Sequence, residues 1–144
     1  MKILVDTGAW VALNVPGDRY HSEALKILEV LRRKHALFVV TDYILDETVT
    51  LMLKKGGHSK ASALGMQILK SPSVKFTIID QAIWSRAWEI FRKYSDKIWS
   101  FTDCVSFAVM DSLKIEDAFA FDNNFLQYGK RLLKSDSGSV TAKN

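Results

Sequence analysis

The stretch SFTDCVSFAVM, residues 100–110, decides the fold that we expect for this chain. Ser100 can cap the start of a helix, and Asp103 stands three residues later, which is the spacing of a capping box. The rest of the stretch is apolar except for Ser106. A helix that is apolar nearly all round is buried between other elements. The stretch therefore predicts a buried helix with a carboxylate at its N-terminus, although helix capping alone would explain Asp103.

Short apolar runs elsewhere in the chain predict the strands that this helix would cover. The first of them is rich in branched residues, three more are apolar runs of similar length, and a fifth could form an edge strand; they lie at residues 2–5, 36–40, 74–79, 118–121 and 131–133. Helical patterns separate them, at residues 22–31, 42–55, 58–70, 80–94 and 100–110. Apolar strands joined by helices are typical of a parallel sheet covered on both faces. We expect an α/β protein, a three-layer α/β/α sandwich with four to five mainly parallel strands.

The length and composition set the domain organisation. A chain of 144 residues that is 48% hydrophobic can bury one proper core. The segment 135–139 is small and polar, so we expect one domain at 1–134 and a flexible tail at 135–144. No apolar run is long enough for a membrane span, and the start does not have the pattern of a signal peptide. These features predict a soluble, cytoplasmic protein without a membrane partner.

The sequence lacks the patterns that are typical of several common chemistries. The single cysteine, Cys104, excludes an internal disulfide, and the three histidines have no zinc-ligand spacing. The chain contains no glycine-rich phosphate loop and no pattern of a nucleophilic serine. A net charge of +4 is compatible with a polyanionic partner. Basic residues near helix ends, such as Lys54, Lys55 and Lys60, could equally be solvated.

Carboxylates follow the ends of several predicted strands. Asp6 and Asp122 come directly after strands, and Asp103 opens the buried helix. In open parallel sheets, sites form outside the carboxyl ends of the strands. Acids brought together there repel, so they imply raised pKa values or a bound cation, and oxygen ligands favour Mg²⁺ or Mn²⁺. Position alone does not select the site, because Asp42 and Asp80 also follow predicted strands.

Four motifs in this order resemble the PIN-domain family of nucleases, and among them the single-domain toxin ribonucleases of VapBC toxin–antitoxin systems. They are ILVDT at 3–7, Glu47 within a helix, SFTDC at 100–104 and FDNNF at 121–125, and the resemblance spans residues 1–133. It implies an α/β/α sandwich with an acidic pocket that holds Mg²⁺ or Mn²⁺. The implied activity is metal-dependent endonucleolytic cleavage of RNA.

The resemblance also implies roles for individual residues. The residues at its acidic positions, which would be both catalytic and metal-binding, are Asp6, Glu47, Asp103 and Asp122. For Glu47 the helix pattern by itself favours a solvated side chain. Thr7 and Thr102 could orient the carboxylates through their hydroxyls. Many family members carry another acid where this chain has Asn124, which could coordinate through its carbonyl oxygen but adds no charge, so the number of metal ions stays open.

Partners and alternative functions follow from the same resemblance. It implies a homodimer and an antitoxin protein that blocks the pocket, and Lys54, Lys55 and Lys60 could receive the RNA backbone. One alternative is a PIN-domain nuclease in RNA processing or DNA cleavage. Another is a PIN scaffold that binds RNA or protein without cutting. A receiver-like phosphoacceptor module would need paired acids after the first strand, whereas Thr7 follows Asp6.

Overall fold

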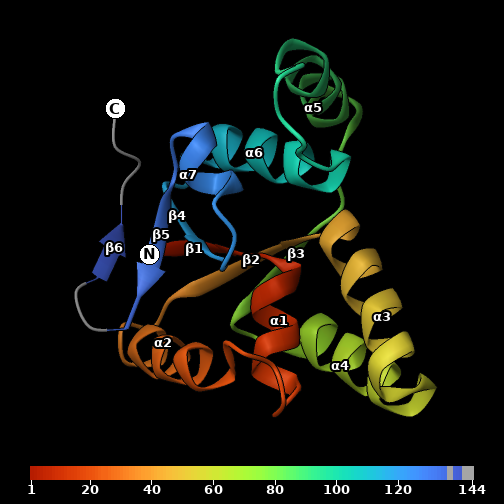
Figure 1. The fold of residues 1–144 in the computed structure, drawn as a ribbon, viewed down its shortest axis with the longest axis vertical. Helices are drawn as coiled ribbons and strands as arrows, with labels where there is room; N and C mark the ends of the chain where they lie inside the picture. The colour runs from red at the N-terminus through yellow and green to blue at the C-terminus, as the bar shows by residue number, and fades with distance from the viewer. Residues whose placement is uncertain (136–137, 141–144) are drawn as a thin grey trace.

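The structure, a computed structural model, describes residues 1–135 and 138–140 (Figure 1). Its sheet has the strand order β3-β2-β1-β4-β5-β6. The strands are β1 (Lys2–Val5), β2 (Leu37–Thr41), β3 (Val74–Thr77), β4 (Asp117–Phe119), β5 (Arg131–Lys134) and β6 (Gly138–Val140). The first five are joined by parallel pairing, and β6 pairs antiparallel with β5. The predicted parallel sheet is confirmed. The strand expected at 131–133 is β5, but it lies between β4 and β6 and is therefore not the edge strand that the sequence had predicted.

Helices cover both faces of the sheet, which confirms the α/β/α sandwich. They are α1 (Thr7–Asn14), α2 (His21–Arg33), α3 (Asp42–Gly56), α4 (His58–Lys70), α5 (Gln81–Lys93), α6 (Phe101–Leu113) and α7 (Asn124–Tyr128). In Figure 1 the sheet lies between α6 and α7 on one side and α1, α2 and α4 on the other. Helix α5 packs on α6 rather than on the sheet.

Helix α6 is buried as its sequence predicts. Every residue from Asp103 to Met110 is inaccessible or nearly so, and the one hydroxyl among the apolar residues, Ser106 Oγ, donates to the carbonyl of Thr102 at 3.1 Å. Phe107 packs edge-on against Phe125 in the middle of the core. The burial of this helix fixes the position of its first turn, and therefore of Asp103.

The C-terminal segment differs in part from the expectation. Strand β6 lies within the segment for which a flexible tail was predicted, and it extends the sheet by one short antiparallel strand. The remaining tail residues, 136–137 and 141–144, lie outside the described part of the structure. The domain boundary at residue 134 stays a prediction. Across the described residues, none of the helices combines the length and the apolar character needed to cross a membrane.

Candidate metal centre

Three carboxylates meet at the C-terminal edge of the sheet. Asp6 ends β1 and is the N-cap of α1, Asp103 lies in the first turn of α6, and Asp122 follows β4. Parallel pairing of β1 with β4 places the ends of these two strands side by side. One oxygen from each carboxylate lies within 4.8 Å of the others. Asp6 and Asp103 are only 6% and 8% exposed, whereas Asp122 faces solvent.

The capping box of α6 orients the Asp103 carboxylate. Ser100 Oγ accepts a hydrogen bond from the Asp103 backbone N–H, and Asp103 Oδ2 accepts one from the Ser100 backbone N–H, each at 3.0 Å. Asn124 Nδ2 also donates to Asp103 Oδ2, at 2.9 Å. Helix capping and a place in the carboxylate cluster are therefore combined in one residue. Because two donors already occupy Oδ2, Oδ1 is the oxygen that remains open to a cation.

Burial and mutual repulsion make the cluster electrostatically unfavourable without a cation. Burial raises the pKa of Asp6 well above its usual range, and the charges of Asp103 and Asp122 raise it further. Burial also raises the pKa of Asp103 and that of Asp122, while hydrogen bonds from Ser100 and Asn124 partly oppose these shifts. A divalent cation would relieve the repulsion and favour the ionised forms.

Glu47 lies apart from this trio although it shares the same pocket. The pocket, of about 560 Å³, is lined by the three aspartates and by Glu47, which is exposed on α3. Its charge adds a small contribution to the raised pKa of Asp6, after burial and the charges of Asp103 and Asp122. The structure thus places Glu47 at the rim, and its role as a ligand stays a prediction.

The two threonines expected to orient the carboxylates occupy different positions. Thr7 is buried beside Asp6, lines the pocket, and its Oγ1 accepts a hydrogen bond from Thr48 Oγ1 at 3.3 Å. Thr102 lies one residue before Asp103, but α6 lines the described pocket through Asp103, with Ser100 beside it, and not through Thr102. The predicted role therefore has geometric support for Thr7 and stays a prediction for Thr102.

The two other acids that follow strands have ordinary structural roles. Asp80 caps α5, because its Oδ1 accepts a hydrogen bond from the Ile83 backbone N–H at 2.9 Å. Asp42 Oδ1 accepts a hydrogen bond from the Ile79 backbone N–H at 3.3 Å, and so ties α3 to the segment after β3. Neither belongs to the carboxylate cluster. Of the four aspartates that follow strands, the structure therefore brings Asp6 and Asp122 into the cluster and leaves Asp42 and Asp80 out of it.

The pocket has an aromatic and basic wall that the sequence analysis missed. Tyr20 stacks on Phe121 with ring centroids 4.5 Å apart, and the Arg19 guanidinium lies 4.9 Å from the centroid of the Tyr20 ring. Arg19 and Tyr20 follow the turn after α1, where a single arginine and tyrosine give no specific signal. Lys55 also lines the pocket, whereas Lys54 and Lys60 are exposed elsewhere on the described surface.

The donor set fits a hard divalent cation. The clustered side chains offer carboxylate oxygens, and no histidine or cysteine joins them among the described residues. Such ligands suit Mg²⁺ or Mn²⁺ rather than zinc. The fold and the site together define a class: parallel α/β/α sandwiches with an acidic pocket, which could hold a metal ion, at the C-terminal edge of the sheet.

Comparison with known proteins identifies the family within this class. The PIN domain family matches residues 3–131, and the chain belongs to that family. It is 32% identical over 127 residues to the "23S rRNA-specific endonuclease VapC20" of Mycobacterium tuberculosis, an alignment that covers 88% of this chain and 94% of that protein. It is 27% identical over 150 residues to a "VapC ribonuclease" of Archaeoglobus fulgidus, covering 99% of this chain and 94% of the relative.

A solved structure supports the same assignment. The crystal structure of Mycobacterium tuberculosis VapC20, described as a Sarcin-Ricin loop cleaving toxin, superposes with a TM-score of 0.80 at 32% identity. The match covers 89% of this chain and 95% of that one. The predicted PIN-like fold and the predicted family are therefore confirmed.

Proposed function

We propose that this protein is a metal-dependent endoribonuclease that hydrolyses phosphodiester bonds in RNA, and that it is the toxin of a toxin–antitoxin pair. The observation that carries the proposal is the convergence of Asp6, Asp103 and Asp122 within 4.8 Å, in a chain of the PIN family. The VapC20 relative, which is named as an endonuclease specific for 23S rRNA, supports RNA as the substrate.

Each acidic residue has a distinct part in the proposed mechanism. Asp6 and Asp103, which are buried, and Asp122, at the mouth, hold the cation, with Mg²⁺ or Mn²⁺ as the candidates. When bound, the cation lowers the pKa of a water and stabilises charge on the phosphate. Glu47 at the rim orients the attacking water and supplements the ligand set. The capping box holds Asp103 in one rotamer, so the carboxylate needs no rearrangement for binding.

The walls of the pocket supply the contacts to RNA. Lys55 and Arg19 place positive charge beside the carboxylates, where a phosphodiester backbone would otherwise be repelled. The stacked rings of Tyr20 and Phe121 offer a surface on which a base can stack. Lys54 and Lys60 lie outside the pocket and serve at most as distant contacts to the backbone.

Cleavage of end-labelled RNA, including a fragment of 23S rRNA, tests the proposal. The purified protein is assayed with Mg²⁺, with Mn²⁺ and with chelator, beside Asp6→Asn and Asp103→Asn. Removing a carboxylate from the cluster is expected to lower the rate by at least about a hundredfold. Asp46→Asn is the matched control, because Asp46 is exposed on α3 away from the pocket. Cleavage that persists in chelator, or in both cluster variants, would contradict the proposal.

Two alternative functions keep the fold. A PIN nuclease in RNA processing or DNA cleavage would use the same acids, and a small antitoxin-like reading frame beside the gene would distinguish the toxin from it. A scaffold that binds without cutting is favoured by one observation, namely that Asn124 contributes an amide to the cluster rather than an acid. Metal binding without cleavage of any tested RNA or DNA would favour the scaffold.

Two protein partners complete the proposal. The first is a second copy of the chain, which would cover an aromatic face of α5 formed by Trp84, Trp88 and Phe91, all exposed and in ring contact with Phe101. Light scattering that finds only monomer at every concentration would contradict this homodimer.

The second partner is an antitoxin that occupies the acidic pocket in the cytoplasm. Co-purification of the two proteins and inhibition of cleavage by the antitoxin would test this partnership.

A further inference from the structure

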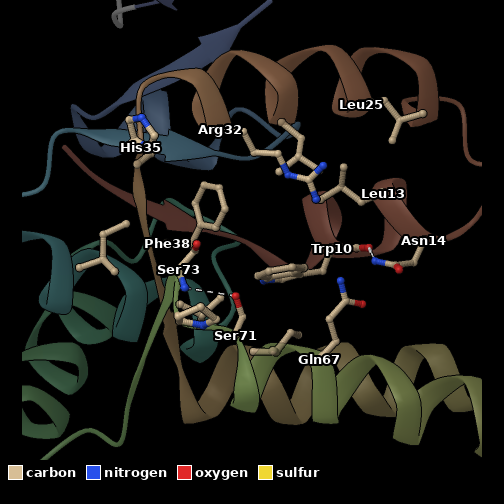
Figure 2. Close-up of a pocket in the computed structure, with 16 residues that line it drawn as sticks. Trp10, Leu13, Asn14, Leu25, Arg32, His35, Phe38, Gln67, Ser71 and Ser73 are labelled. Atoms are coloured by element: carbon tan, nitrogen blue, oxygen red, sulfur yellow. Dashed lines mark hydrogen bonds between the residues drawn. The ribbon is translucent and has the colours of Figure 1, made fainter.

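A second pocket, of about 420 Å³, lies at the edge of the sheet opposite to the carboxylates (Figure 2). Its walls come from the later turns of α1, α2 and α4 and from the starts of β2 and β3. In a parallel sheet the starts of the strands lie at the edge away from their carboxyl ends. The pocket is therefore separate from the candidate metal centre, and its volume is typical of small-ligand pockets, which span roughly 300–1,000 Å³.

Trp10 is the feature of this pocket that points to a ligand. Its side chain is 7% exposed, and its Nε1 is buried without a hydrogen-bond partner among the described residues. Figure 2 shows the ring in the middle of the pocket, with Gln67 and Ser71 below it and Arg32 above it. Buried donors in folded proteins are nearly always paired. The indole N–H therefore has no acceptor within the described part of the chain.

Arg32 gives the pocket its charge. It is the one Lys, Arg, Asp or Glu side chain among the described residues that line the pocket. Its neighbour Arg33 pairs with Glu29 one turn earlier, whereas Arg32 reaches from α2 over Trp10. The C-terminal end of α2 contributes partial negative charge here, and Arg33 at the same end of the helix offsets it. The pocket is therefore suited to an anionic group.

The remaining walls are partly apolar, beside the polar side chains of Asn14, His35, Gln67, Ser71 and Ser73. Phe38 and Leu13 line the pocket on either side of the Arg32 side chain, and Ile68 lines it from α4. These side chains would take up an apolar body of about the size of a fused ring pair. The pocket thus combines apolar side chains with one N–H donor that is unpaired among the described residues and with one cation.

We propose that this pocket binds a small amphipathic carboxylate. Its flat apolar body lies against Trp10 and Phe38, and its carboxylate accepts the Trp10 Nε1 hydrogen and pairs with Arg32. The proposal does not depend on the proposed nuclease activity. Helix α1 links it to the metal centre, since the backbone N–H of Trp10 donates to the carbonyl of Asp6, the N-cap of that helix, at 3.2 Å.

The test follows the indole N–H of Trp10 directly. The full chain has four tryptophans, and in the ¹⁵N-labelled protein Trp10→Phe identifies which indole signal belongs to Trp10. The probes are 2-naphthoate and its uncharged analogue 2-naphthylmethanol. We expect 2-naphthoate to move the Trp10 indole signal in a saturable way, and the alcohol to bind more weakly.

Matched variants test the carboxylate contact. Arg32→Gln is expected to weaken naphthoate binding by about threefold or more. Arg33→Gln is the control, because Arg33 is exposed on the same turn but lies outside the pocket. Arg32 is also exposed, so its variant is expected to fold.

Three outcomes would overturn the proposal. The first is the absence of a saturable shift of the Trp10 signal at naphthoate concentrations up to about 5 mM, the range of the weakest specific binding. The second is equal affinity for the acid and the alcohol, with Arg32→Gln behaving like Arg33→Gln. The third is a response confined to the signals of Trp84 and Trp88, which would place binding on the exposed face of α5 instead.

Discussion

The two pockets beside α1 favour groups of opposite charge. At the start of the helix, Asp6 meets Asp103 and Asp122, and the mutual repulsion of these carboxylates favours a cation. Further along the helix, Trp10 has a buried N–H without an acceptor among the described residues, in a pocket that Arg32 also lines. The difference shows that one short helix can carry two sites of opposite charge preference, because its N-terminus meets the carboxyl ends of the strands and its C-terminus meets their starts.

The largest effect that separates the two pockets is the response of stability to metal. Saturating Mg²⁺ is expected to raise the melting temperature of the wild type by about 5 °C or more, as for a ligand well above its dissociation constant. Asp6→Asn removes most of this gain because it removes a ligand. Differential scanning fluorimetry with Mg²⁺ and with chelator measures both. Trp10→Phe, at the other pocket, is the control and keeps the full response.

The stability of the metal-free protein is expected to depend on pH through the carboxylates of the acidic pocket. Burial and repulsion raise the pKa of Asp6, so the folded state binds its proton more tightly than the unfolded state does. Its contribution to the free energy of unfolding is therefore greatest below the usual carboxyl pKa and is lost as the pH rises through the raised pKa. In chelator, Asp6→Asn is expected to be more stable than the wild type at neutral pH. A variant that is less stable there would contradict the unfavourable burial of this charge.

A smaller effect is expected from a substitution at Asn124, which tests whether the uncharged amide limits metal binding in the acidic pocket. Its Nδ2 donates to Asp103 Oδ2, so an uncharged amide stands next to the carboxylate cluster. Asn124→Asp replaces this donor with a fourth carboxylate. We expect Mn²⁺ affinity to rise by about tenfold, or a second ion to bind, because added negative charge nearby favours the cation. Isothermal titration calorimetry measures both the affinity and the number of ions.

Asn123→Asp is the matched control for this prediction. Asn123 is exposed and its side chain makes no cap hydrogen bond in the described structure. The control adds the same charge one residue away, without replacing the donor to Asp103. If both variants bind Mn²⁺ like the wild type, the amide of Asn124 does not limit the metal site.

Much of the fold followed from local sequence patterns. The capping box of Ser100 and Asp103 and the apolar residues after it predicted a buried helix, and α6 has both features. Apolar runs located the five parallel strands because buried strands need them. Strand β6 gave no such signal, since it lies in a small, polar segment and is recognised in the structure by its pairing with β5.

The candidate metal centre could be predicted only from several motifs together, in their order along the chain, because no single motif is specific. Asp6, Asp42, Asp80 and Asp122 all follow strands, and it is the sheet topology that brings Asp6 and Asp122 together at neighbouring strands. The pocket around Trp10 had no sequence signature at all. Its walls come from five elements, and each of its residues alone fits an ordinary amphipathic helix or strand end.

The smallest expected effect concerns the charge at the rim of the acidic pocket. Lys55 lines this pocket and Lys54, its neighbour, does not, although both were equal candidates for RNA contacts in the sequence analysis. Lys55→Gln is expected to weaken RNA binding several-fold and to reduce the slope of log affinity against log salt by about 0.7, the value for one phosphate contact to single-stranded RNA. Lys54→Gln is the control and leaves the slope unchanged. Filter binding with Asp6→Asn as the background avoids cleavage during the measurement, and equal slopes for both lysine variants would remove Lys55 from the proposed RNA path.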